Sequence, residues 1–186
     1  TYLEDYDRYQ AANFKDNPKF KKMVEHSIQI MSPGYTPQIG DTDYAMAQLH
    51  WATGFQANAG WKMYKEPIYA QLIYYFNGNK TEGLRYGIDH ENPELLSDEV
   101  QEVIDEYGTF RIPSNMLTGF GFAALRSGED HSDKISSGSY ENRHDVWMYF
   151  GLNGGHGHTD SLNLGMTAYG LNFMPELGYP EATGMQ

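Results

Sequence analysis

GGHGHTDSLNLGMTAYG, residues 154–170, brings two imidazoles and a carboxylate within five residues of one another. In an extended backbone, residues two apart point the same way, so His156, His158 and Asp160 can share one face. The glycines around them let the backbone approach another surface closely. Good strand formers follow from Leu162 to Tyr169. The stretch therefore predicts functional groups held at the entrance to a β-sheet.

Further strand patterns lie on both sides of this stretch. Residues 111–126 are strand-like, and residues 171–177 form a strand that follows a tight turn at Gly170. Residues 144–151 alternate, which places Val146 and Met148 on one side and Trp147 and Tyr149 on the other. Together these segments predict an antiparallel sheet.

The first part of the chain has helical spacing instead. Residues 1–12 carry an aromatic stripe, and Asn17-Pro18 supplies an N-cap with proline at the first helical position of the next helix. Further helices are expected over residues 45–59, 67–76 and 97–107. The class is therefore α+β, with a helical domain over residues 1–110 and a sheet domain over residues 111–186. The sequence at both ends predicts that the chain is a piece of a larger protein.

Composition narrows the classes of partner. The formal net charge is −12, which argues against nucleic acid and against anionic lipid as partners. No apolar run approaches the roughly 20 residues that span a bilayer, no signal peptide is visible, and cysteine is absent. Fifteen tyrosines offer flat apolar faces with polar tips, which suit contact with sugars or with protein surfaces.

The residues alone leave three interpretations of His156 and His158. They are zinc ligands together with a carboxylate such as Glu176, or acid–base and charge-stabilising groups, or structural histidines in a glycine-rich turn. Asp41 and Asp43 have similar alternatives, as acid–base groups, calcium ligands or, with better support, turn and cap residues. His50 is interpreted as structural.

Three segments, in the right order, resemble the heparinase II/III-like polysaccharide lyases. The most specific is residues 154–162, continued by Tyr169-Gly170 and by the turn at residues 176–179. Residues 119–128, GFGFAALRSG, look like the first strand of the family's sandwich. Residues 38–43, QIGDTD, look like a loop between its helices.

The resemblance implies the end of an incomplete α/α toroid followed by the start of an antiparallel β-sandwich, with an acidic polysaccharide between them. It implies a carbon–oxygen lyase that degrades a uronate polymer, such as a glycosaminoglycan or alginate, by β-elimination. Periplasmic or secreted location follows from the family alone. The remaining parts of the polypeptide, or a homo-oligomer, are the expected protein partners.

The resemblance also implies roles for individual residues. His156 matches the catalytic histidine that faces the substrate carboxylate or moves a proton. His158 matches a ligand of a structural zinc ion, and Glu176 stands where the family usually has a second, aspartate ligand. Asp160 is an orienting and substrate-binding candidate, as is Tyr2, which lies near the region of the family's catalytic tyrosine.

Two other functions fit the same residues. A non-catalytic carbohydrate-binding or surface-assembly protein would keep the fold and the tyrosines without a complete set of catalytic groups. A zinc-dependent hydrolase would need a metal-activated water and another ligand.

Overall fold

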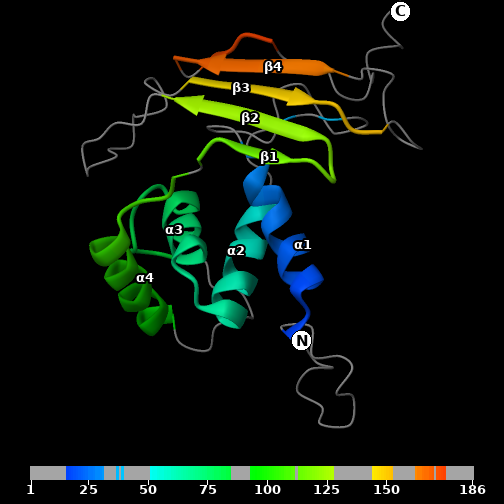
Figure 1. The fold of residues 1–186 in the computed structure, drawn as a ribbon. Helices are drawn as coiled ribbons and strands as arrows, with labels where there is room; N and C mark the ends of the chain where they lie inside the picture. Colours follow the sequence, from blue (N-terminus) through cyan, green and yellow to red (C-terminus); the bar gives the residue numbers. More distant parts are fainter. Residues whose placement is uncertain are drawn as a thin grey trace, which may run out of the picture. The chain divides into compact units, whose positions relative to one another are not determined.

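The computed structural model describes residues 16–31, 37, 39, 51–84, 93–111, 113–127, 144–152, 162–169 and 171–174. Within them lie four helices and a five-stranded antiparallel sheet, so the α+β class is confirmed (Figure 1). The chain divides into two compact units. One comprises Thr1–Ile28 and Trp51–Phe110, and the other comprises Gln29–His50 and Arg111–Gln186.

The helices begin and end where local chemistry favours it. In α1 (Pro18–Gln29), the side chain of Asn17 accepts a hydrogen bond from the backbone N–H of Lys19 at 3.0 Å, which confirms the predicted cap. In α3 (Pro67–Phe76), proline occupies the first turn, and Asn77 ends the helix. The second helix, α2 (Trp51–Tyr64), extends beyond the predicted end at residue 59, and the predicted start at residue 45 lies outside the described residues.

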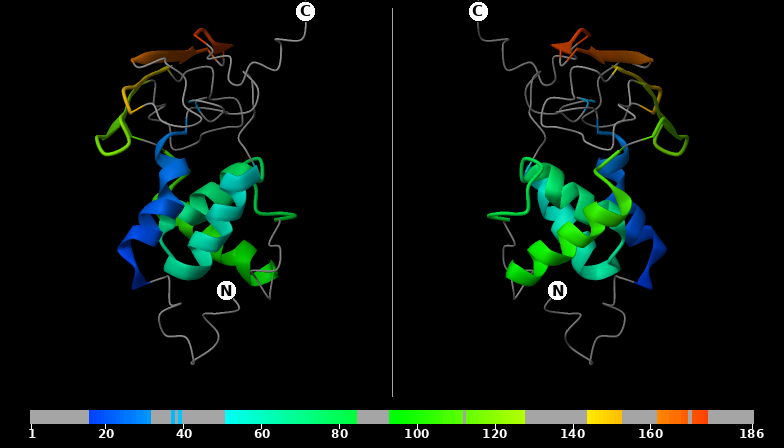
Figure 2. Two further views of the ribbon diagram at one scale, coloured as in Figure 1. Left: turned by 90° about the vertical axis from the view of Figure 1, so that its right-hand side faces the viewer. Right: turned by 90° about the vertical axis from the view of Figure 1, so that its left-hand side faces the viewer.

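The last helix, α4 (Pro93–Tyr107), starts four residues before the predicted Ser97. Proline is well suited to the first turn, and the Ser97 hydroxyl instead donates to the carbonyl of Thr81 at 3.1 Å. The helix ends at Tyr107, as predicted, and Gly108 follows it with a φ of +76°. Figure 2 shows α2, α3 and α4 from two further sides, with α3 packed against both neighbours.

The strands follow one another in sequence order: β1 (Asn115–Leu117), β2 (Phe122–Ser127), β3 (His144–Tyr149), β4 (Asn163–Ala168) and β5 (Leu171–Asn172). The strand-like pattern predicted over residues 111–126 holds two strands, β1 and β2, and not one. Residues 118–121 form a turn in which the N–H groups of Phe120 and Gly121 both donate to the carbonyl of Leu117. Gly121 has a φ of +82°, which glycine adopts without steric cost.

One face of the sheet forms the core of its unit. Phe122, Ala124 and Trp147 are buried together, and the rings of Phe122 and Trp147 stack at 6.1 Å. The predicted alternation in β3 is confirmed, with Trp147 on the buried side and Val146 on the exposed one. The opposite face carries apolar side chains that remain exposed, among them Leu125, Val146, Leu164 and Leu171.

Gly165 of β4 lies directly against the indole of Trp147. A Cβ atom at Gly165 would lie 2.1 Å from an indole carbon. We expect Gly165→Ala to lower the free energy of unfolding by about 1–3 kcal/mol, because the indole must shift within a packed core. Urea unfolding followed by tryptophan fluorescence measures the change.

Gly119→Ala is the matched control, since a Cβ atom there meets nothing within 4 Å. It should leave the urea midpoint within experimental error of the wild type. Equal midpoints for Gly165→Ala and the wild type would contradict the packing of Trp147 on β4.

Candidate functional site

The predicted site residues all fall outside the described residues: Tyr2, His156, His158, Asp160 and Glu176. The same holds for Asp41, Asp43 and His50. The roles assigned to these side chains therefore stay predictions. What the structure describes is the pair of strands that the histidine-containing stretch connects.

That stretch, residues 153–161, joins β3 to β4. The two strands are antiparallel neighbours, with Tyr149 opposite Asn163 at the end where the connection leaves and returns. Leu162, just before β4, has a φ of +69°. This left-handed conformation is uncommon for a leucine and commonly marks a backbone bend held by its surroundings. The connection thus returns to the sheet through a defined bend.

Close backbone contacts hold this end of the sheet together. The backbone N–H of Phe150 donates to the carbonyl of Gly121 at 2.6 Å, so the exit from β3 lies against the β1–β2 turn. A Cβ atom at Gly121 would lie 2.3 Å from the backbone of Gly151, which leaves no room for a side chain. The rings of Phe120 and Tyr149 meet at 5.5 Å beside this crossing.

Exposed apolar side chains lie on both sides of the connection. Phe150 and Leu152 precede it, and Leu162 follows it. The Leu152 side chain is almost fully exposed. Exposed apolar groups therefore flank the connection in the sequence.

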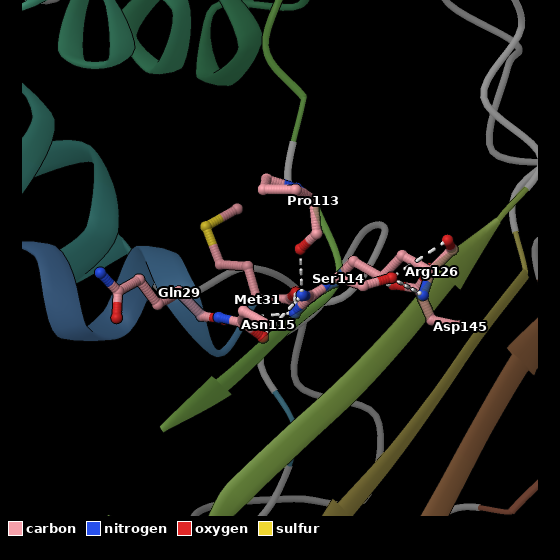
Figure 3. Close-up of polar contacts among 7 residues, drawn as sticks. All are labelled: Gln29, Met31, Pro113, Ser114, Asn115, Arg126 and Asp145. Carbon is pink, nitrogen blue, oxygen red and sulfur yellow. Dashed lines mark hydrogen bonds and ion pairs between the residues drawn. The ribbon is translucent and has the colours of Figure 1, made fainter. Parts of the chain in front are cut away.

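A buried guanidinium lies at the opposite end of the same strands (Figure 3). Arg126 is the fifth residue of β2, and its side chain is only 2% exposed. Its two terminal nitrogens donate to four oxygens: Pro113 O at 2.8 Å, Asn115 Oδ1 at 2.9 Å, Gln29 O at 3.2 Å and Met31 O at 2.9 Å. Its Nε lies 3.6 Å from Oδ2 of the fully buried Asp145.

This guanidinium has a structural role. Its terminal donors are already used by backbone and side-chain oxygens, and its burial keeps a polymer from reaching it. Arg126 therefore does not bind the carboxylate of a bound substrate. Sequence reasoning missed the cluster, because only the register of β2 and β3 sets Arg126 opposite Asp145.

The helical unit contains a buried tyrosine beside a carboxylate. The Tyr69 hydroxyl donates to Oε1 of Glu25 at 3.2 Å, and the Tyr69 side chain is fully buried. Burial raises the pKa of Tyr69 well above its ordinary value, and the Glu25 carboxylate raises that pKa further. Because this tyrosine cannot reach a polymer and holds its proton tightly, it is not an acid for a leaving group.

Within the described ranges, no group of three or more histidine, aspartate and glutamate side chains gathers closely enough to hold a metal ion. The predicted ligands, His158 and Glu176, lie outside those ranges.

Among the described helices, none is both long and apolar enough to cross a membrane.

Comparison with protein-family models finds no match for this chain. Comparison with curated proteins likewise finds none.

Replacing Arg126 tests the buried cluster. We expect Arg126→Met to lower the free energy of unfolding by about 3–5 kcal/mol, because it leaves the buried Asp145 carboxylate without its ion pair. The double variant Arg126→Met/Asp145→Leu should lose less than the single variant, since it removes the charge as well. Chemical denaturation measures both values.

The control is Arg111→Met, at an exposed position, which should stay within about 0.5 kcal/mol of the wild type. A double variant less stable than Arg126→Met would show that the ion pair is not what the single substitution disrupts.

Tyr69 predicts a pH dependence of stability. The pKa of its hydroxyl is higher in the folded state than the ordinary value of 10.0, so the folded protein holds this proton more tightly than the unfolded chain. The contribution of this pKa difference to the free energy of unfolding is complete below pH 10.0 and declines as the pH rises above that value. In Tyr69→Phe the unfolding free energy should therefore fall less steeply in alkaline solution than in the wild type. Parallel slopes in pH-dependent denaturation would contradict this.

Proposed function

We propose that this chain is part of a polysaccharide lyase that cleaves an acidic, uronate-containing polysaccharide by β-elimination. The observation that carries the proposal is the His-Gly-His-Thr-Asp segment, residues 156–160, in the connection between two paired antiparallel strands. Support comes from the close backbone contacts where this connection leaves β3, and from the exposed apolar groups that flank it. The finer fold, the end of an α/α toroid and the start of a β-sandwich, belongs to the same proposal.

The reaction needs three functions from the protein. The carboxylate on C5 must be neutralised, so that the proton on C5 becomes acidic. A base then removes that proton, the C4–C5 double bond forms, and the C4–O4 bond breaks. An acid finally protonates the leaving O4.

We assign His156 to the substrate carboxylate or to the proton transfer, because an imidazole changes charge near neutral pH. Asp160, two residues beyond His158, would orient the stretch and contact the substrate. Tyr2 is the other proposed substrate contact. Tyr69 is not the acid that protonates O4, because its hydroxyl is buried.

His158 and Glu176 are the residues of this chain that would hold a zinc ion. Imidazole nitrogen and carboxylate oxygen are both common zinc ligands. The ion would have a structural role, by joining the histidine stretch to the residues that follow β5. The resemblance to the polysaccharide lyases also leads us to propose that the protein acts in the periplasm or outside the cell.

Substitution of His156 tests the function. In the full-length protein, His156→Ala should reduce formation of the unsaturated uronate product about 100- to 10,000-fold. Ultraviolet absorbance of the new double bond measures the rate on alginate and on a glycosaminoglycan. His26→Ala, which removes a histidine of α1 outside the proposed site, is the matched control and should retain activity.

Two outcomes would overturn the proposal. A His156→Ala variant with wild-type turnover removes the catalytic role of this residue. A wild-type protein that binds the polymers without unsaturated product is instead the non-catalytic carbohydrate-binding protein.

A further inference from the structure

A row of polar side chains crosses four strands on the buried face of the sheet. Arg126 of β2 is opposite Asp145 of β3, Asp145 is opposite Thr167 of β4, and Thr167 is opposite Asn172 of β5. Directly opposite residues in antiparallel strands place their Cβ atoms about 4.5–5.5 Å apart. The side chains of Asp145, Thr167 and Asn172 therefore lie side by side.

The last two members of the row have polar atoms that need a partner. Thr167 is 5% exposed. Its Oγ1 and the Oδ1 of Asn172 are both buried and have no hydrogen-bond partner in the described part of the chain. Leaving such an atom unsatisfied costs about 1–3 kcal/mol. Arg126 does not supply the partner, because its terminal nitrogens donate elsewhere.

The backbone pairing brings these two side chains close together. The N–H of Phe173 donates to the carbonyl of Met166 at 2.8 Å, which makes those two residues a hydrogen-bonded pair. The adjacent pair, Thr167 and Asn172, is then of the non-hydrogen-bonded kind, in which opposite side chains approach most closely. A single small polar molecule can therefore contact both.

We propose that Asp145, Thr167 and Asn172 bind one buried water molecule. The hydroxyl of Thr167 donates to the water, and the water donates to Oδ1 of Asn172 and to the Asp145 carboxylate. These three hydrogen bonds are typical of a buried water. They give a partner to Thr167 Oγ1, to Asn172 Oδ1 and to one oxygen of the Asp145 carboxylate.

A metal ion fits this group less well. The three side chains offer four oxygens, which are fewer than the six to eight that calcium takes. The Arg126 guanidinium, 3.6 Å from Asp145, already offsets the negative charge of that carboxylate. The water would also help to hold β5, which is only two residues long, because it joins Asn172 to Thr167 and Asp145. The chain continues from β5 toward Glu176.

Thr167→Val tests the proposal, since it keeps the shape of the side chain and removes the hydroxyl. If a water satisfies the hydroxyl, the unfolding equilibrium constant should rise about tenfold. Thr118→Val makes the same change at an exposed position and should leave this constant within about twofold. A more stable Thr167→Val protein would overturn the proposal, since an unsatisfied hydroxyl is better removed.

A high-resolution crystal structure of the wild-type protein provides the direct observation. The expected result is a solvent peak at normal hydrogen-bond distance from Thr167 Oγ1 and Asn172 Oδ1. A direct bond between these two side chains, or a peak at the roughly 2.3–2.6 Å typical of calcium–oxygen contacts, would each overturn the proposal.

Discussion

The guanidinium of Arg126 must be satisfied in a place that water does not reach. A buried, unpaired charge would cost several kcal/mol, so its position constrains every group around it. Backbone carbonyls of Gln29, Met31 and Pro113 converge on its terminal nitrogens, and Asp145 supplies the countercharge. One side chain therefore joins the chain just before β1, the pair of strands β2 and β3, and the backbone of Gln29 and Met31.

The same strands serve different purposes at their two ends. Charged and polar groups occupy the end with Arg126, while aromatic rings and close backbone contacts occupy the end that the histidine-containing connection joins. The β3–β4 register is continuous between the two ends. A site on the connection would thus be attached to paired strands. A shift in their register would break the buried row of polar side chains that begins at Arg126.

Sequence patterns predicted the elements that depend on local chemistry. Asn17 with Pro18, and the alternation around Trp147, describe interactions between near neighbours in the chain. The turn at residues 118–121 was missed, because apolar residues around glycine satisfy a strand pattern equally well. The role of Arg126 was beyond sequence reasoning, since it depends on which residues face one another across strands.

The candidate site was predicted from chemistry and from a resemblance, and its side chains lie outside the described residues. The sequence gives the identity and spacing of His156, His158 and Asp160, which are local properties. Their distance from Glu176 or Tyr2 depends on how distant segments meet. Spacing along the chain does not determine such distances.

The span of the Arg126 hydrogen bonds also bears on how the protein is made. Gln29 and Met31 precede Arg126 by 97 and 95 residues. At the roughly 5–20 residues per second of synthesis, their carbonyls emerge from the ribosome about 5–20 s before the side chain that binds them. These two hydrogen bonds therefore form only after β2 has been synthesised, whatever partners the two carbonyls have before that.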